Sequence, residues 1–225
     1  MDHSERLGEA PAEEKQPSKW KQIRTMYPDA FRPFFEITEG EVFERMRLSV
    51  IPTNTQFFEM CEKRPDIYGP FWILTTLIFC ISFAGNLAMW LASSGSKYDF
   101  NFVPFAATLV YGVGLFIPFC LWLVCRKLNP SSRIVDFVCL YGYSLTVFLP
   151  VTLLCSLDFE LLRWILIVYA TGSSAYFIFL NLDKVLISQV GENVKLRYAL
   201  IGGTLIGHCL MGLYYRVYFF GGIDD

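Results

Sequence analysis

Residues 63–90 read KRPDIYGPFWILTTLIFCISFAGNLAMW, and the character of the chain changes in the middle of this stretch. Residues 63–66 carry both basic and acidic side chains, whereas no charged side chain occurs between Phe71 and Lys97. A helix that crosses the hydrocarbon core of a bilayer needs about 20 apolar residues, and the second half of the stretch supplies them. Residues 66–70 therefore form a short, half-polar hinge where the chain enters the membrane.

The rest of the chain repeats this apolar pattern. Of its 225 residues, 54% are hydrophobic and only 18% are charged, against about a quarter charged in soluble domains. Because lipid offers the backbone no hydrogen-bond partner, each apolar run must be helical. The predicted spans are residues 72–92, 102–125, 134–156, 161–182 and 198–220. The predicted class is an all-α membrane protein: a five-helix bundle at 72–222 with a partly disordered arm at 1–71.

The basic residues of the short loops predict the orientation of the bundle. They gather in the second loop (Arg126, Lys127 and Arg133) and in the fourth (Lys184, Lys195 and Arg197). Loops rich in Lys and Arg stay on the cytoplasmic side. The arm is then cytosolic and the C-terminus lies in the lumen or outside. The net charge of −2 gives no reason to expect nucleic acid as a partner.

The arm itself has two segments of predicted helix. Residues 1–18 are polar and predicted to be disordered. Capping-box spacing precedes helices at 38–50 and 53–63, with expected apolar faces formed by Val42, Phe43, Met46 and Val50 and by Phe57, Phe58, Met60 and Cys61. So small a segment can barely bury a core of its own. These faces should lie on the membrane surface, on the bundle or on a partner.

The hinge has the residues of a membrane-entry device. Pro70 suits the first turn of a helix, where its missing N–H costs nothing. Gly69 allows a sharp turn into that helix, and the Asp66 carboxylate can accept the free N–H groups at its start.

The same residues resemble a known family. Asp66-Ile67-Tyr68-Gly69-Pro70-Phe71-Trp72, followed by the predicted spans, is similar to the Yip (Ypt-interacting protein) domain family, whose motif here is D-L-Y-G-P. Tyr141-Gly142-Tyr143-Ser144 resembles its second motif. Gly85-Asn86-Leu87 and Ile51-Pro52 resemble the branch with human members one and two. The resemblance covers about residues 35–222, and Ile67 in place of Leu is the departure in the first motif.

The resemblance implies a non-enzymatic adaptor. Family members are multi-pass Golgi proteins of vesicle-mediated transport with a cytosolic N-terminus and a lumenal C-terminus. They bind prenylated Rab-type small GTPases and one another as hetero-oligomers, and no cofactor is implied. Carried over by position, the residues expected to bind partners are Asp66, Tyr68, Gly69 and Pro70.

Small residues predict helix packing inside the membrane. Gly203 and Gly207 form a G-x-x-x-G pattern, and Gly142 with Tyr143 lies in the third predicted span. Small residues let helices approach closely in lipid. The contact can lie within one chain or between chains.

Two polar residues in the predicted spans would fit other functions. His208 lies deep in the fifth predicted span, which would fit a lipid or ion transporter, and Ser144 lies at a matching depth, which would fit an intramembrane serine hydrolase. No carboxylate shares the depth of His208, and Leu145 follows Ser144 where rhomboid-type enzymes have Gly. No phosphate-binding loop or metal-ligand spacing occurs in the sequence.

The cysteines are expected to be reduced. Six of them lie in the predicted spans, as small packing residues: Cys80, Cys120, Cys125, Cys139, Cys155 and Cys209. Cys61 lies on the cytosolic arm, where thiols stay reduced.

Overall fold

The computed structural model describes residues 32–52, 56–92, 98–157, 159–191 and 193–220. Residues 34–225 form one compact unit. Of the other unit, residues 1–33, only Arg32 and Pro33 are described. The predicted disorder of residues 1–18 lies outside the described residues.

Every regular element in the described part of the chain is a helix. In chain order these are η1 (Arg32–Phe34), α2 (Glu39–Val50), α3 (Gln56–Lys63), α4 (Tyr68–Ala92), α5 (Phe102–Tyr111), η2 (Gly112–Phe116), α6 (Ile117–Leu128), α7 (Ile134–Ser144), η3 (Leu145–Val147), α8 (Phe148–Leu154), α9 (Glu160–Val190) and α10 (Val194–Phe220). Five helical runs among them are long and apolar enough to cross a membrane: Tyr68–Leu91, Phe102–Leu128, Ile134–Leu154, Glu160–Val190 and Val194–Phe220. The predicted five-span, all-α class is confirmed.

The helix of the fourth span, α9, continues past the predicted end of that span. The charged residues Asp183 and Lys184 marked that end in the sequence, but α9 runs on to Val190. Asp183 Oδ1 lies 3.2 Å from Arg197 Nε of α10. A helix does not need an apolar environment to continue, and this ion pair joins α9 to α10 beyond the apolar segment.

Two spans change their hydrogen-bonding pattern just before a proline. In the second span the π-helical segment η2 precedes Pro118. In the third span the 3-10 segment η3 precedes Pro150. Proline has no N–H to donate to the carbonyl group one turn earlier, so the helix must rearrange there.

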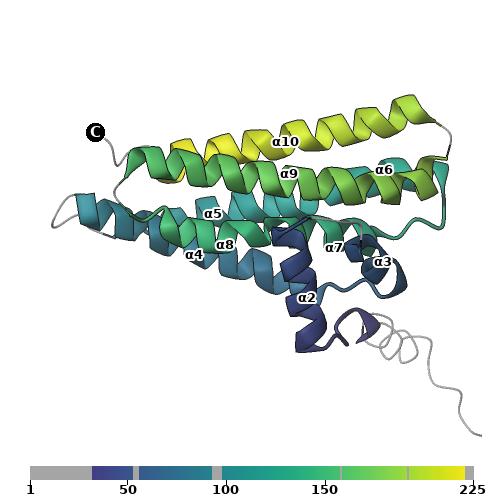
Figure 1. Cartoon of the computed structure of the whole chain (residues 1–225), viewed down its shortest axis with the longest axis horizontal. Coiled ribbons are helices and arrows are strands. Elements are labelled where there is room, and N and C mark those ends of the chain that lie inside the picture. Colours follow the sequence, from purple (N-terminus) through teal and green to yellow (C-terminus); the bar gives the residue numbers. More distant parts are fainter. Residues whose placement is uncertain (1–31, 53–55, 93–97, 158, 192, 221–225) are drawn as a thin grey trace, which may run out of the picture. The chain divides into compact units, whose positions relative to one another are not determined.

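The third span lies at the centre of the bundle. In its most apolar stretch 72% of the residues are buried, compared with 28% in the second and fifth spans. Helix α4 packs on α7 and α8, which also contact α9, while α10 runs along α9 (Figure 1).

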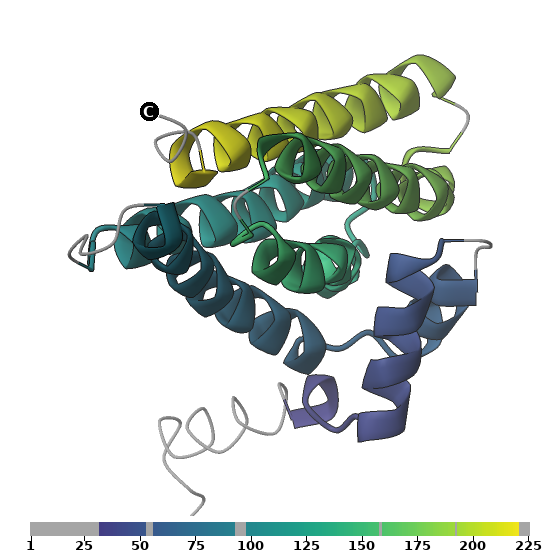
Figure 2. The same cartoon turned by 60° about the vertical axis from the view of Figure 1, so that its left-hand side comes forward.

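The arm helices do pack on the bundle. In both views α2 runs across the direction of the long helices (Figures 1 and 2), and α2 and α3 contact α7 and α9. Of the three locations left open by the sequence, the bundle is the one observed. The expected face of α2 was partly wrong: Phe43 points outward and is 70% exposed, whereas Arg45, Leu48 and Ser49 are buried.

Candidate functional site

The hinge residue Asp66 holds the start of α4. Its Oδ2 accepts a hydrogen bond of 2.7 Å from the Gly69 N–H. This satisfies one of the amide groups that have no partner inside a helix, as the sequence indicated. Upstream, the Ile67 N–H donates to the Phe34 carbonyl group at 2.9 Å. Hydrogen bonds thus join the hinge both to the start of α4 and to the upstream residue Phe34.

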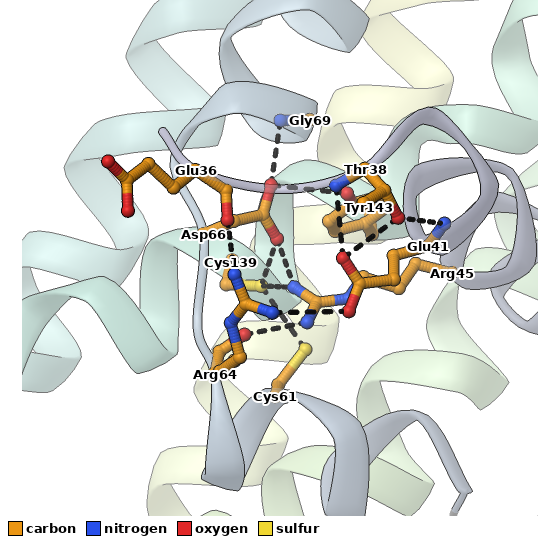
Figure 3. Close-up of polar contacts among 10 residues, drawn as sticks. All are labelled: Glu36, Thr38, Glu41, Arg45, Cys61, Arg64, Asp66, Gly69, Cys139 and Tyr143. Atoms are coloured by element: carbon orange, nitrogen blue, oxygen red, sulfur yellow. Dashed lines mark hydrogen bonds and ion pairs between the residues drawn. The ribbon is translucent and has the colours of Figure 1, made fainter. Parts of the chain in front are cut away.

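A buried ion pair joins this hinge to α2. Arg45 Nη1 donates to Asp66 Oδ1, and each residue is 2% exposed (Figure 3). Arg45 Nη2 also donates to the Arg64 carbonyl group at 2.6 Å. Two charges can be buried only when they are paired and hydrogen-bonded, and removal of one partner leaves the other uncompensated. Arg45 therefore fixes α2 to the hinge.

The second motif packs directly against the first. The Tyr143 hydroxyl group of α7 donates to Asp66 Oδ2 at 3.2 Å (Figure 3). A Cβ atom added to Gly69 would collide with the Tyr143 hydroxyl group, and one added to Gly142 would collide with Pro70. Gly69 leaves room for the Tyr143 side chain, and Gly142 lets the backbone of α7 approach Pro70. The motifs, far apart in sequence, form one structural unit.

The second arm helix adds an aromatic anchor. Phe57 of α3 is 1% exposed. Its ring lies edge-on to Tyr143 of α7, with centroids 5.5 Å apart, and to Phe177 of α9, with centroids 4.7 Å apart. Such pairs contribute about 0.5–1.5 kcal/mol beyond the burial of their area. At the end of α2 the Ser173 hydroxyl group of α9 donates to the Val50 carbonyl group at 3.2 Å.

The start of α2 has the capping box predicted from the sequence. The Glu41 N–H donates to Thr38 Oγ1 at 3.4 Å, and the Thr38 N–H donates to Glu41 Oε2 at 3.0 Å. Hydrogen bonds from the Thr38 backbone and hydroxyl group lower the pKa of Glu41. Arg64 adds an ion pair to Glu41 at 3.5 Å and donates to the Glu36 carbonyl group.

We call these residues the junction: Thr38, Glu41, Arg45, Phe57, Cys61, Arg64, Asp66, Gly69, Pro70, Cys139, Gly142 and Tyr143. Arg45 was not among the site residues predicted from the sequence. It could have been found from its position three residues before Leu48 and four before Ser49, which places it on the buried face of the helix. An arginine there requires a carboxylate partner, and Asp66 supplies it.

Of the residues predicted to bind partners, Asp66, Gly69 and Pro70 are buried within the junction. Tyr68 is 39% exposed, and its ring lies edge-on to Trp72 with centroids 6.3 Å apart. Tyr68 is therefore the exposed residue of these four, while Asp66, Gly69 and Pro70 hold the hinge in its conformation. Partner binding by these residues remains a prediction.

The α10 glycines predicted to pack helices have different surroundings. A Cβ atom on Gly207 would lie 3.3 Å from Ile117 Cδ1, so this glycine faces the second span. A Cβ atom on Gly203 would meet no atom within 4 Å from the other described helices. Gly203 therefore lies on an open face of α10.

Ser144 and His208 both contact the same residue. Ser144 Oγ donates to the Tyr141 carbonyl group at 2.6 Å, and the Tyr141 hydroxyl group lies 3.1 Å from His208 Nδ1. Within the described residues no hydrogen bond joins the serine to the histidine, so the dyad considered from the sequence is not formed in this arrangement. In the same part of the chain, no group of three His, Cys, Asp or Glu side chains could hold a metal ion.

The fold and junction define a five-span helical membrane protein with its N-terminal helices docked on the bundle. Comparison with known proteins identifies its family. The Yip1 domain family model matches residues 48–215, so the chain belongs to the Yip1 domain family. This stretch contains both motifs of the junction.

Two curated relatives agree with this assignment. The YIPF1 homolog of Dictyostelium discoideum is 32% identical over 193 residues, which cover 84% of this chain and 55% of that protein. The chain thus spans little more than half the length of that relative. YIP5 of Schizosaccharomyces pombe is 33% identical over 207 residues, which cover 86% of this chain and 80% of that protein. No solved structure matches the chain.

Proposed function

We propose that this protein is a Golgi membrane adaptor of vesicle-mediated transport that binds prenylated Rab-type GTPases and other Yip-family proteins. The observation that carries the proposal is the junction itself. The two family motifs form a buried contact that holds α2 and α3 on the bundle. A partner therefore meets a preformed surface, and the entropy cost of ordering it on binding is low.

The outer side of this arm offers apolar contacts. Phe43 is 70% exposed, Ile51 is 58% exposed, and Tyr68 at the start of α4 is 39% exposed. Phe43 and Ile51 lie outside the five spans. A partner that covers these side chains would remove apolar surface from water, which favours binding. In this proposal Tyr68 contacts the partner, and Asp66, Gly69 and Pro70 set its position.

The position of the arm on the bundle also supports a cytosolic N-terminus. Arg133 Nη2 donates to the Glu62 carbonyl group of α3 at 3.4 Å. The arm thus lies at the end of the bundle that carries the second loop, where Arg126, Lys127 and Arg133 gather. Basic loops favour the cytoplasmic side. After five spans the C-terminus is then lumenal.

For the contacts with other Yip-family proteins, the open face of α10 around Gly203 is the proposed surface. Helix association in lipid depends on close packing of small residues. A glycine without an intrachain neighbour can accept another helix, and membrane lipids cover it otherwise.

Cross-linking affinity purification from intact membranes tests the arm surface. Phe43→Ala combined with Tyr68→Ala removes exposed rings and leaves the junction intact. We expect recovery of Rab-type GTPases to fall several-fold, while Phe79→Ala, a ring of α4 that is 63% exposed in a span, leaves it unchanged. Equal recovery from all three proteins would contradict the proposed surface.

A second variant separates the hinge from the surface. Asp66→Ala combined with Gly69→Leu disrupts the junction itself, so the arm loses its fixed position and recovery should fall further. Recovery of neither GTPases nor Yip-family proteins with the wild type would contradict the adaptor function.

A further inference from the structure

Two thiol groups from distant parts of the chain meet in the junction. Cys61 of α3 and Cys139 of α7 are 78 positions apart, yet their Sγ atoms lie 3.2 Å apart (Figure 3). Both are free cysteines. One belongs to the arm and the other to the central span, so a bond between them would join the arm covalently to the bundle.

The charged groups of the junction surround this pair. The Cys139 S–H donates to Asp66 Oδ1 at 3.4 Å, and Arg45 Nη1 lies 3.9 Å from Cys139 Sγ. These contacts hold the Cys139 sulfur atom in place beside Cys61 Sγ.

A cavity gives small molecules access to Cys61. It has a volume of about 120 Å³ and lies between α3, α7 and α9, where Phe58, Cys61, Leu140 and Asn181 contribute to its wall. Asn181 is 1% exposed, and its Oδ1 has no hydrogen-bond partner among the described residues. One water occupies about 30 Å³ of liquid. Hydrogen peroxide, only slightly larger than water, fits this space and can donate to Asn181.

We propose that Cys61 and Cys139 form a reversible disulfide that fastens the arm to the bundle when a peroxide enters this cavity. The Cys61 sulfur attacks one peroxide oxygen, the O–O bond breaks, and Cys61 sulfenic acid and one water form. The Cys139 sulfur then attacks the Cys61 sulfur, the S–O bond breaks, and a second water leaves with the Cys139 proton. Two thiols are oxidised and one peroxide is reduced to two waters.

The bond closes a long loop of the chain. A thiol reductant reverses it by exchange, as expected for a cysteine pair in a reducing compartment. The oxidised chain keeps the arm docked even when the Arg45–Asp66 pair opens. This device concerns the position of the arm and does not depend on which partner the arm binds.

The test uses the full chain in membranes, with a site-specific protease sequence inserted after Pro130, between the two cysteines. Membranes are treated with submillimolar hydrogen peroxide, alkylated, cleaved and separated without reductant. We expect the two fragments to stay joined in the wild type and to separate when a reductant is added. Mass spectrometry should then identify the Cys61–Cys139 peptide pair.

Matched variants make the result specific. Cys61→Ser and Cys139→Ser should each leave the fragments separate after oxidation, whereas Cys125→Ser, a change at another buried cysteine, should leave them joined. Cys61→Ala and Cys139→Ala replace any serine variant that fails to reach wild-type abundance. Separate fragments in the oxidised wild type, or joined fragments in the Cys139 variants, would overturn the proposal.

Discussion

Gly69 and Gly142 of the junction and Gly203 of α10 carry similar sequence signals but have different surroundings. At Gly69 and Gly142 an added methyl group would collide with Tyr143 and Pro70. At Gly203 it would meet no atom of another described helix within 4 Å. The first pair lets two segments of one chain touch, whereas Gly203 faces outward. A glycine in the sequence of a membrane helix therefore does not by itself show that another helix packs closely against it; the structure must show which segment lies beside it.

The largest expected effect comes from the charge at the centre of the junction. Asp66→Asn keeps an acceptor for the Gly69 N–H but removes the partner of Arg45. Loss of one member of a buried ion pair costs about 3–5 kcal/mol. We expect the free energy of unfolding in micelles, measured by denaturant titration, to fall by about this amount.

A matched control shows whether burial is the reason. Asp183→Asn breaks the ion pair between Asp183 and Arg197. The Asp183 side chain is 27% exposed and the Arg197 side chain is 17% exposed. Partly exposed pairs contribute about 0–1 kcal/mol. Equal losses in Asp66→Asn and Asp183→Asn would show that the junction pair is no more important than a peripheral one.

Next in size is the contact between the two motifs. Gly142→Ala places a methyl group against Pro70, and overpacking of this kind costs about 1–3 kcal/mol. Gly203→Ala is the control, because alanine there adds helix propensity of up to about 1 kcal/mol and meets no neighbour. Thermal unfolding of the two variants should shift in opposite directions. Equal downward shifts in both variants would contradict the different surroundings of Gly142 and Gly203.

The open face of α10 is tested by a larger side chain. Gly203→Leu should leave the unfolding midpoint of the single chain nearly unchanged, because no other described helix has an atom within 4 Å of the added Cβ. Close helix–helix approach between chains should be lost. We expect the oligomeric fraction in nanodiscs, counted by single-molecule photobleaching, to fall several-fold. An unchanged fraction together with a destabilised chain would place this face inside the monomer.

The smallest effect is expected at the start of α2. Thr38→Ala removes the capping box and should cost about 1 kcal/mol. Because hydrogen bonds from Thr38 lower the pKa of Glu41, the contribution is present at neutral pH. Glutamate in the unfolded chain has a pKa of about 4.3. The contribution begins to fall when the pH drops below this value, and it is lost once the pH has passed the lower pKa of Glu41 in the folded state.

Amide exchange of α2 at pH 7 and pH 3 measures this difference. Thr38→Ala should speed exchange about five-fold at neutral pH and have less effect in acid. Glu59→Gln, an exposed change on α3, serves as the control. An effect of Thr38→Ala that grows in acid would contradict the capping role.

The sequence predicted the spans well because their apolar length is dictated by the bilayer alone. It also located the capping residues Thr38 and Asp66, since their partners lie only three positions away. It did not find Arg45, nor the contact of Gly142 with Pro70, because these depend on how distant segments meet. The charges at Asp183 and Lys184 predict the end of the apolar span and not the end of the helix, because Asp183 pairs with Arg197 of the next helix.

The buried Arg45–Asp66 pair fastens the arm to the bundle. Hydrogen–deuterium exchange of Glu39–Val50 in nanodiscs, compared between the wild type and Arg45→Met, measures how firmly it does so. A loss of about 3 kcal/mol or more should speed exchange in α2 by about a hundredfold. The amides of α10 should keep their wild-type rates. Wild-type exchange rates throughout α2 in Arg45→Met would contradict the claim.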